Sequence, residues 1–97
     1  MYVRFDWDES KNESNFRKHG IHFEIAIRVF QDPEYLTEQD REVDGEERWL
    51  TIGWIGDVMV VAVAHTVEDE DEDMVVRIVS ARKATRQESR RYEANTD

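Results

Sequence analysis

The sequence RWLTIGWIGDVMVVAVAHT, residues 48–66, carries the strongest secondary-structure signal of the chain. Residues 48–55 and 58–66 are rich in β-branched and aromatic side chains, and Gly56-Asp57 between them is a favourable two-residue turn. The sequence therefore predicts a β-hairpin at the centre of the fold. Side chains alternate along a strand, so Trp49 and Trp54 lie on opposite faces, and we expect one of them to be exposed or covered by a partner.

The chain that follows this hairpin predicts one more strand and a helix. Residues 68–73 are six consecutive acids, whose mutual repulsion predicts a mobile tip at low salt. Residues 74–80 form the returning strand. Thr85 and Glu88 make a T-x-x-E capping box, which predicts a last helix over residues 86–94.

The chain that precedes the hairpin predicts a strand and two helices. Residues 3–7 alternate between apolar and polar side chains, as a short strand does. Asp8 is suited to cap a helix that runs to about His19, and Gly20 closes it. A second helix fits residues 22–30, where aromatic and aliphatic side chains recur at helical spacing.

These elements predict a single α+β domain. Residues 34–44 add at most a short edge strand at Tyr35-Leu36, because they are polar and irregular. A chain of 97 residues has room for one core, and it has no repeats and no Pro- or Gly-rich linker. We therefore expect one domain over residues 1–97, in which an antiparallel β-sheet carries two N-terminal helices and a C-terminal helix on one face.

The composition excludes several classes of protein. The chain has no cysteine, which excludes disulfides and thiolate metal sites. Its N-terminus lacks the pattern of a signal peptide, and no apolar run approaches the roughly 20 residues that span a bilayer. We therefore expect a cytoplasmic protein without a membrane partner. The net charge of -10 has several explanations: a basic protein partner, repulsion of unwanted nucleic acid, a high-salt cell or simple solubility.

Several separated blocks of the sequence resemble the motifs of a known family. Residues 7–26, WDESKNESNFRKHGIHFEIA, match W-D-x-x-K-x-x-x-N-x-x-K-H-G-x-x-F-x-x-A, and residues 30–33 match F-x-D-P. Residues 45–53 match G-E-x-R-W-x-x-x-G, and residues 65–66 match H-T. Residues 77–92 match R-I-x-S-A-R-x-A-T-x-x-E-x-x-x-Y. With these blocks in this order, the chain resembles BrnT, the ribonuclease toxin of bacterial and archaeal type II toxin–antitoxin pairs.

The resemblance implies a fold, an activity and a partner. It implies a compact RelE-like fold, growth arrest by RNA cleavage, and neutralisation by a BrnA-like antitoxin that carries a ribbon-helix-helix DNA-binding domain. The complex is expected to repress its own operon, as a hetero-oligomer of two toxins and two antitoxins, with a dimer expected for the toxin crystallised alone. Two alternatives stay open: a non-catalytic interaction module that survives as the partner of a repressor, and a binder of single-stranded nucleic acid.

The junction between the last strand and the last helix is the first candidate for a phosphate site. Five cations and one acid fall within residues 82–91 of an otherwise acidic chain. Ser80, Arg82 and Lys83, together with backbone N–H groups of the first helical turn, predict an anion pocket. Arg86 and Arg90 lie on one face of the helix, where they track RNA phosphates, bind acidic residues of the antitoxin or of the 68–73 tip, or remain solvated.

The central strands supply further candidates, since RNA cleavage without a metal needs a base, an acid, cations near the phosphorane and groups that hold the bases. His65 is a candidate acid or base, or else a partly buried histidine. Arg77 either emerges into a cleft or is paired. Glu47 and Arg48 form a candidate base and phosphate clamp, or a surface ion pair. Trp49 is a candidate for base stacking, or packs under a helix.

The end of the first helix is ambiguous. Lys18 and His19 either take part in RNA binding or interact with the helix dipole. His19 and His22 are three residues apart, but Gly20 interrupts the helix between them and no carboxylate completes a metal site. Residues 68–73 lack the glycine of a calcium-binding loop. We therefore expect neither a metal nor a cofactor.

Overall fold

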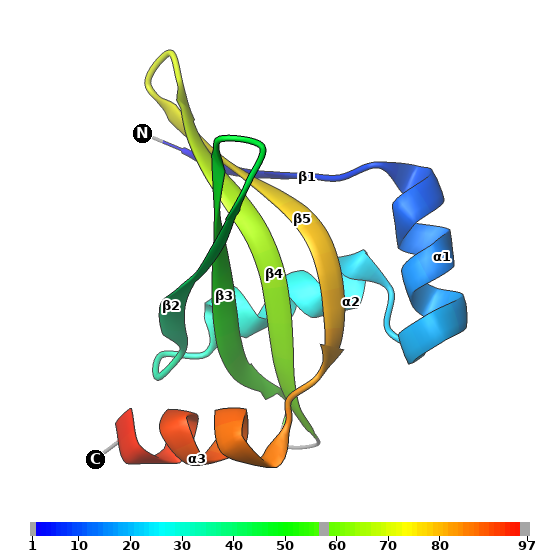
Figure 1. Ribbon diagram of the computed structural model, residues 1–97, viewed down its shortest axis with the longest axis vertical. Helices are drawn as coiled ribbons and strands as arrows, with labels where there is room; N and C mark the ends of the chain where they lie inside the picture. The colour runs from blue at the N-terminus through cyan, green and yellow to red at the C-terminus, as the bar shows by residue number, and fades with distance from the viewer. Residues whose placement is uncertain (1, 57–58, 96–97) are drawn as a thin grey trace.

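The computed structural model describes residues 2–56 and 59–95. A five-stranded sheet with strand order β1-β5-β4-β3-β2 forms the body of the molecule (Figure 1). Its strands are β1 (Val3–Asp6), β2 (Leu36–Val43), β3 (Glu46–Ile55), β4 (Met59–Glu70) and β5 (Asp73–Lys83). The helical elements are α1 (Glu9–His19), α2 (Phe23–Ala26), the 3₁₀ helix η1 (Ile27–Gln31) and α3 (Arg86–Asn95).

The sheet is mixed, with its first strand beside its last. β1 runs parallel to β5, with Val3 opposite Met74, whereas the other neighbouring strands are antiparallel. The expected α+β class is therefore confirmed, but the sheet is not wholly antiparallel. The parallel pairing places the N-terminal strand beside the last strand of the sheet, far from the C-terminus at the end of α3 (Figure 1).

The β4–β5 hairpin is longer than the sequence predicts. The strands continue to a two-residue turn at Asp71-Glu72, where Asp71 adopts a left-handed φ of 58°. Most of the six acids therefore lie in strands, and Arg4 on β1 pairs with Glu70 at 3.4 Å and with Asp73 at 3.7 Å. Of the alternatives for Arg86 and Arg90, binding to the 68–73 tip is wrong, because this turn and α3 lie at opposite ends of the molecule (Figure 1).

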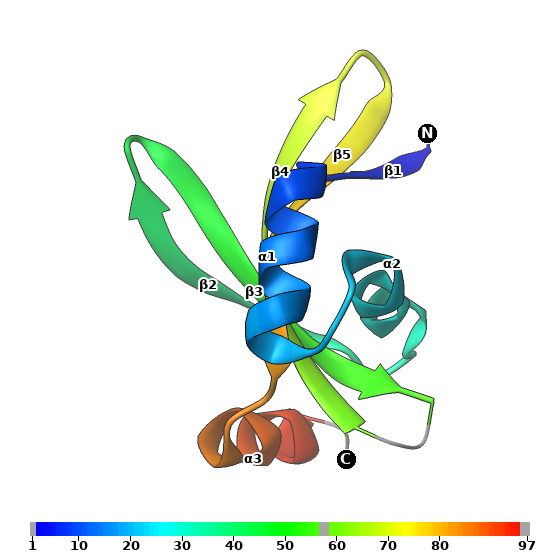
Figure 2. The same cartoon turned by 90° about the vertical axis from the view of Figure 1, so that its right-hand side faces the viewer.

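A second hairpin, β2–β3, occupies the region that the sequence leaves irregular. Its turn is Asp44-Gly45, and both residues have positive φ (51° and 81°), as a type I′ turn requires. The side chains of β2 are mostly polar and show no apolar–polar alternation, so the sequence does not indicate this strand. As an edge strand, it is held by backbone pairing. Figure 2 shows the tips of the two hairpins splaying apart. The predicted turn at Gly56-Asp57 lies partly outside the described residues, and Gly56 itself has a φ of 58°.

The predicted helices are present, and they do not share one face of the sheet. α1 begins after Asp8, whose Oδ1 accepts from the Ser10 amide at 2.8 Å, and it ends at Gly20 with a φ of 72°. The predicted second helix divides into α2 and η1, which cover one face through Phe23 and Val29. α3 lies at one end of the opposite face, where Tyr92 completes a smaller apolar cluster. No helix among the described residues is long and apolar enough to cross a membrane.

Asn15 attaches α1 to the edge of β5. β1 ends at Asp6, beside Arg77, so the rest of β5 has no neighbouring strand on that side. There the Asn15 side chain donates to the Ala81 carbonyl at 2.9 Å and accepts from the Ala81 amide at 3.0 Å. It thus satisfies the backbone groups that a further strand would otherwise bind, and it fixes the end of α1 beside the sheet.

Candidate functional site

Alternation along β3, β4 and β5 divides the predicted site residues between two faces of the sheet. The covered face packs against α2 and η1, and the open face carries α3 at one end (Figures 1 and 2). The register pairs Leu50 with Ala64, Ala64 with Ser80, and Ala62 with Arg82, and these side chains belong to the open face. The open face is therefore the one that presents Ser80 and Arg82.

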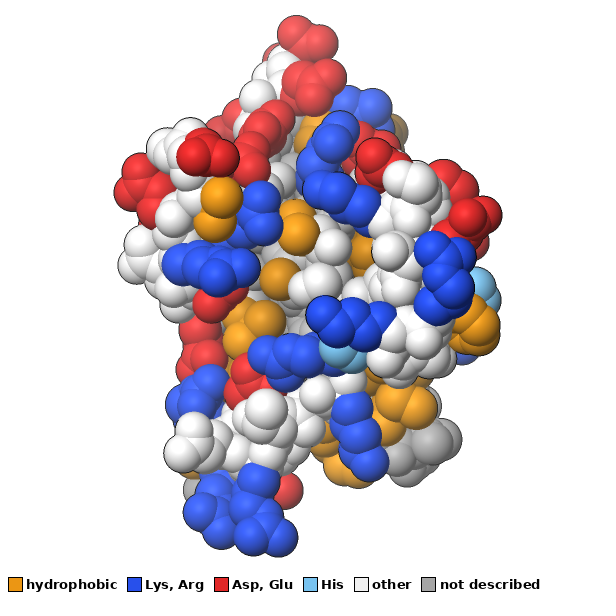
Figure 3. All heavy atoms as spheres, turned by 45° about the vertical axis from the view of Figure 1, so that its right-hand side comes forward, with side chains coloured by type: hydrophobic (Ala, Val, Ile, Leu, Met, Phe, Trp, Pro, Cys, Tyr) orange, Lys and Arg blue, Asp and Glu red, His pale blue; other side chains and the backbone are white. Residues whose placement is uncertain are grey.

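The open face consists of lateral rows that cross β3, β4 and β5. The pairing of β3 with β4 ends at Trp49–His65, and alternation makes Arg48 and Thr66 the next open-face side chains of these two strands; Thr66 pairs with Arg77 on β5. The rows are Arg48–Thr66–Arg77, Leu50–Ala64–Ser80 and Ile52–Ala62–Arg82. Figure 3 shows apolar side chains in a hollow with Lys and Arg on both flanks, whereas acids gather toward the hairpin tips.

A cavity of about 420 Å³ opens on this face next to α3. Its floor is formed by small and apolar residues of the central strands, and its walls carry equal numbers of acids and arginines. The charged lining residues are Glu38, Asp40, Glu88, Arg41, Arg82 and Arg91. The lining of this cavity is therefore polar and has no excess of positive charge.

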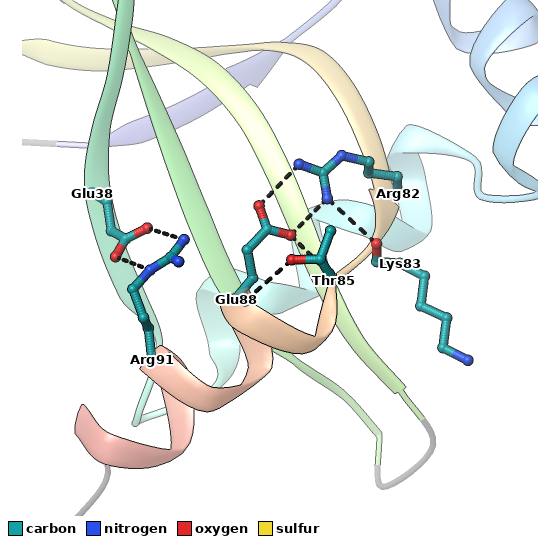
Figure 4. Close-up of polar contacts among 6 residues, drawn as sticks. All are labelled: Glu38, Arg82, Lys83, Thr85, Glu88 and Arg91. Atoms are coloured by element: carbon teal, nitrogen blue, oxygen red, sulfur yellow. Dashed lines mark hydrogen bonds and ion pairs between the residues drawn. The ribbon is translucent and has the colours of Figure 1, made fainter.

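Arg82 and Glu88 form a bidentate ion pair in this cavity. The two guanidinium nitrogens of Arg82 donate to Glu88 Oε1 and Oε2 at 2.7 and 2.9 Å, and the Thr85 amide donates to Oε1 at 2.8 Å (Figure 4). The Arg82 hydrogen bonds lower the pKa of Glu88 to about 2. The Glu88 carboxylate thus occupies the place where the sequence predicts an external anion, and the Lys83 side chain points away from it.

Arg91 on α3 makes a similar pair with Glu38 on β2. Its Nε and a terminal nitrogen donate to the two Glu38 oxygens at 2.8 and 3.0 Å (Figure 4). Arg86 and Arg90 lie on the same helix and are exposed. Among the cations predicted around this helix, Arg82 therefore stabilises the fold through its ion pair with Glu88, whereas Arg86 and Arg90 are exposed to solvent.

A second, smaller cavity of about 210 Å³ lies where the end of α1 meets β5. Lys18 and His19 line it together with Ser80, and Ser80 also lines the larger cavity. The structure therefore brings the ambiguous pair at the end of α1 to the edge of the open face. Sequence separation hides this proximity, which depends on the Asn15 contact.

His65 lies on the covered face, away from these cations. It is 2% exposed, forms a 2.7 Å hydrogen bond through Nε2 with Thr51 Oγ1, and packs edge-to-face against Phe30. Burial lowers the pKa of His65, so the imidazole is held neutral. It contributes to the wall of a largely apolar cavity of about 550 Å³ between β1, η1 and the sheet.

Glu47 and Trp49 share the covered face with His65, because they alternate with Arg48 along β3. Trp49 is half-buried and Trp54 is 40% exposed, so the prediction that one tryptophan remains exposed is confirmed. Arg77 points to the open face, where it pairs with Asp6 at 2.9 Å in an exposed contact. The structure thus separates Glu47, Trp49 and His65 from Arg48, Arg77, Ser80 and Arg82.

Several motif positions are explained by the fold. Asp32 accepts hydrogen bonds from the Trp54 amide at 2.9 Å and from the Tyr92 hydroxyl at 2.5 Å, which ties α3 to the rest of the molecule. A Cβ on Gly53 would lie 3.1 Å from the Val29 carbonyl oxygen, so glycine lets η1 approach β3. Sequence reasoning did not single out Thr66, although alternation from His65 places it on the open face.

Comparison with known proteins agrees with this architecture. The model of a family described as the ribonuclease toxin BrnT of type II toxin–antitoxin systems matches residues 7–88. The 1.1 Å crystal structure of the Brucella abortus ribonuclease toxin BrnT has a TM-score of 0.60 and 24% identity, over 89% of this chain and 99% of that chain. No curated protein matches the chain. The family model spans most of the sequence, and the chain therefore belongs to the BrnT family of ribonuclease toxins of type II toxin–antitoxin systems.

Proposed function

We propose that this toxin is a metal-independent endoribonuclease that binds RNA on the open face of its sheet. The gathering of cations from separate strands on one uncovered face carries this proposal. Arg48 and Arg77 flank that face, and Lys18 and His19 reach its edge beside Ser80. Such a surface binds a phosphodiester backbone even though the whole chain is acidic.

The chemistry needs no group beyond these side chains. The RNA 2′-hydroxyl attacks the neighbouring phosphorus, a 2′,3′-cyclic phosphate forms, and the bond to the 5′-oxygen breaks. A base takes the proton from the 2′-hydroxyl, and an acid donates a proton to the departing 5′-oxygen. We assign both transfers to His19, because it is the histidine that lines the cavity shared with Ser80: its neutral imidazole takes the 2′-hydroxyl proton, and the resulting imidazolium gives a proton to the 5′-oxygen.

Lys18 lines the same cavity as His19 and Ser80, and we assign it to stabilise the negative charge that develops on the phosphorane. Arg77 is available to bind another phosphate of the RNA backbone, since its pair with Asp6 is more than half exposed on both sides and contributes little. Arg82 is bound bidentately by Glu88, so we assign it the role of a positioning residue, which holds the start of α3 against the end of β5. His65 is an unsuitable base, because it is buried on the other face.

Membership of a type II family implies an antitoxin partner. We propose a BrnA-like antitoxin with a ribbon-helix-helix domain, in a complex of two toxins and two antitoxins that represses its own operon. The net charge of -10 supports a partner with a basic toxin-binding segment.

Purified protein incubated with RNA, with and without EDTA, tests the catalytic proposal. We expect products with 2′,3′-cyclic phosphate ends in both conditions. His19→Ala should reduce the cleavage rate by roughly 10²- to 10⁴-fold, and it should remove one limb of the pH–rate profile. His22→Ala is the matched control, because this exposed histidine stacks on Phe16 at 3.8 Å and is absent from the lining of the cavity. Cleavage that requires a metal, or equal rates in the two variants, would contradict the proposal.

The two internal arginine–carboxylate pairs favour one other function, a non-catalytic module that binds the antitoxin only. Induction of the toxin in cells distinguishes the two. Growth arrest that His19→Ala relieves supports the nuclease. A harmless wild-type protein that still binds its antitoxin supports the module.

A further inference from the structure

We propose that Thr66, together with Arg48 and Arg77, forms a phosphate-binding site that holds a nucleotide next to the scissile one. This inference rests on the proposed RNA-cleaving function and adds a residue, Thr66, to the substrate surface. The three side chains form one lateral row of the open face, adjacent to the row that contains Ser80. Successive rows on one face of a strand lie about 6.6 Å apart, so the two rows can contact neighbouring groups of an RNA strand.

Thr66 is the centre of this site because its hydroxyl is buried without a partner. Thr66 is 2% exposed, and its Oγ1 has no hydrogen-bond partner among residues 2–56 and 59–95. A buried hydroxyl that lacks a partner destabilises the folded state by about 1–3 kcal/mol. Neither the core nor the turns of this fold require a hydroxyl at that position, since valine has the same shape.

Arg48 has the same unusual property on the neighbouring strand. Its Nε is buried and likewise lacks a partner within the described part of the chain. A guanidinium Nε–H is a directional donor that binds carboxylates and phosphates together with a terminal nitrogen. Among the described residues, two buried polar groups without partners therefore belong to the open-face side chains that follow the last pair of β3 and β4, and we infer that one ligand oxyanion accepts hydrogen bonds from both.

Arg77 completes the row on the other side of Thr66. It is 57% exposed, and its Asp6 partner is 52% exposed. An exposed pair of this kind is weak and exchanges readily with a competing anion. The long arginine side chains on either side of Thr66 are able to part, which gives a phosphate access to the hydroxyl between them.

The ligand chemistry follows from these donors. Two guanidinium groups and one hydroxyl form a site for an oxyanion with several acceptor oxygens and a full negative charge. A phosphodiester group of single-stranded RNA fits this description. The site carries no side chain that reads a base, so we expect it to position the backbone without sequence preference.

The experiment compares the same substitution at two buried threonines. Thr66→Val removes the unpartnered hydroxyl on the open face. Thr51→Val is the control on the covered face, where the Thr51 hydroxyl binds both Thr37 Oγ1 at 2.8 Å and His65 Nε2 at 2.7 Å. Thr66→Ser retains the hydroxyl and serves as the rescue variant. Binding is measured by fluorescence anisotropy with a fluorescein-labelled 2′-O-methyl oligoribonucleotide, which the protein cannot cleave, and stability is measured by urea unfolding.

We expect opposite responses from the two valine variants. Thr66→Val should keep or raise the urea midpoint while weakening oligonucleotide binding about ten-fold or more, because a hydrogen bond to a charged phosphate is lost. Thr51→Val should lower the midpoint and leave the binding constant of the folded protein unchanged. Thr66→Ser should bind like the wild type.

Each other outcome counts against the site. Unchanged binding by Thr66→Val, or a large loss of its stability, would show that the hydroxyl serves the fold and not the RNA. Inorganic phosphate is the second probe: if it shifts the Arg48 Nε–H resonance and the oligonucleotide does not, the row binds a free anion and the proposal is wrong. Failure of the nuclease proposal is a separate result, namely a wild-type protein that binds the 2′-O-methyl oligonucleotide but does not cleave unmodified RNA, whereas a wild type that does not bind it contradicts the phosphate site as well.

Discussion

His65 and Thr66 are adjacent in the chain, yet alternation gives their side chains opposite surroundings. His65 meets Thr51 and Phe30 on the covered face, and both of its ring nitrogens have hydrogen-bond partners within the protein. Thr66 meets the arginine row of the open face. The titratable His65 therefore packs in the core, whereas the buried Thr66 hydroxyl has no hydrogen-bond partner in the described part of the chain.

The burial of His65 has a measurable consequence for stability. Burial lowers its pKa below the ordinary value of about 6.5, so the unfolded chain binds a proton more readily than the folded one. Stability is therefore fully present above about pH 6.5 and falls as the pH decreases through the window between the unfolded and folded pKa values. Glu24 and Arg28 are the charged residues that line the same cavity among the described residues.

Urea unfolding of the wild type and of His65→Gln, compared at about pH 8 and about pH 5.5, measures this effect. We expect the wild type to lose more stability than the variant between the two values. His19→Gln, at an exposed position, should lose as much as the wild type. Identical losses in the wild type and His65→Gln would show that another group controls the acid sensitivity.

Among the helices and strands, the contact between α1 and the edge of β5 determines where the candidate site forms. Asn15 is buried and makes hydrogen bonds to both backbone groups of Ala81 and to the Ile21 carbonyl. Asn15→Ala would leave these groups buried without partners, and we expect a loss of about 2–4 kcal/mol in the free energy of unfolding. It should also lower the cleavage rate of the folded fraction, because α1 carries His19 to the sheet.

Glu13→Ala is the control for this substitution, since Glu13 is exposed on the same helix. Chemical unfolding followed by tryptophan fluorescence measures both variants. An Asn15→Ala protein as stable as Glu13→Ala would mean that other contacts of α1 hold it in place.

The same elements show what a sequence can and cannot reveal. The caps at Asp8 and Thr85 and the apolar strand β3 are local signals, and the structure has these elements close to their predicted bounds. β2 and the outer half of the β4–β5 hairpin are polar. Backbone pairing defines these segments, and no side-chain pattern in the sequence indicates them. The parallel pairing of β1 with β5 joins segments about seventy residues apart, which a local pattern does not encode.

At the scale of the whole molecule, the arrangement of the candidate site residues on two faces of the sheet could not be predicted from the sequence. The cationic residue types were predictable from composition and motif, whereas their division between two faces depends on which face α2 and η1 cover. A β-bulge between Ala64 and His65 also shifts the register of β5, so counting along the sequence alone does not align Ser80 with Arg77. The edge cavity with Lys18 and His19 needs the tertiary position of α1.

The overall charge predicts opposite responses of folding and RNA binding to salt. The chain has 23 acids against 13 Lys and Arg, and acids cluster on the two splayed hairpins, so mutual repulsion destabilises the folded state. Salt screens this repulsion over a Debye length of about 10 Å at 0.1 M, and the thermal midpoint should therefore rise between about 0.05 and 0.5 M NaCl. RNA binding should weaken over the same range, because releasing counterions from the RNA becomes less favourable as the salt concentration rises.

The slope of that weakening reports the size of the RNA contact. Each phosphate neutralised on a single strand contributes a slope of about -0.7 in log K against log salt. A contact with one phosphate near Ser80 and one at the Thr66 row predicts a slope of about -1.4, and Arg77→Ala should reduce its magnitude by about half. A slope steeper than about -3 would mean that Arg86 and Arg90 extend the contact along α3. A thermal midpoint that falls with salt would mean that favourable ion pairs outweigh the repulsion among the acids.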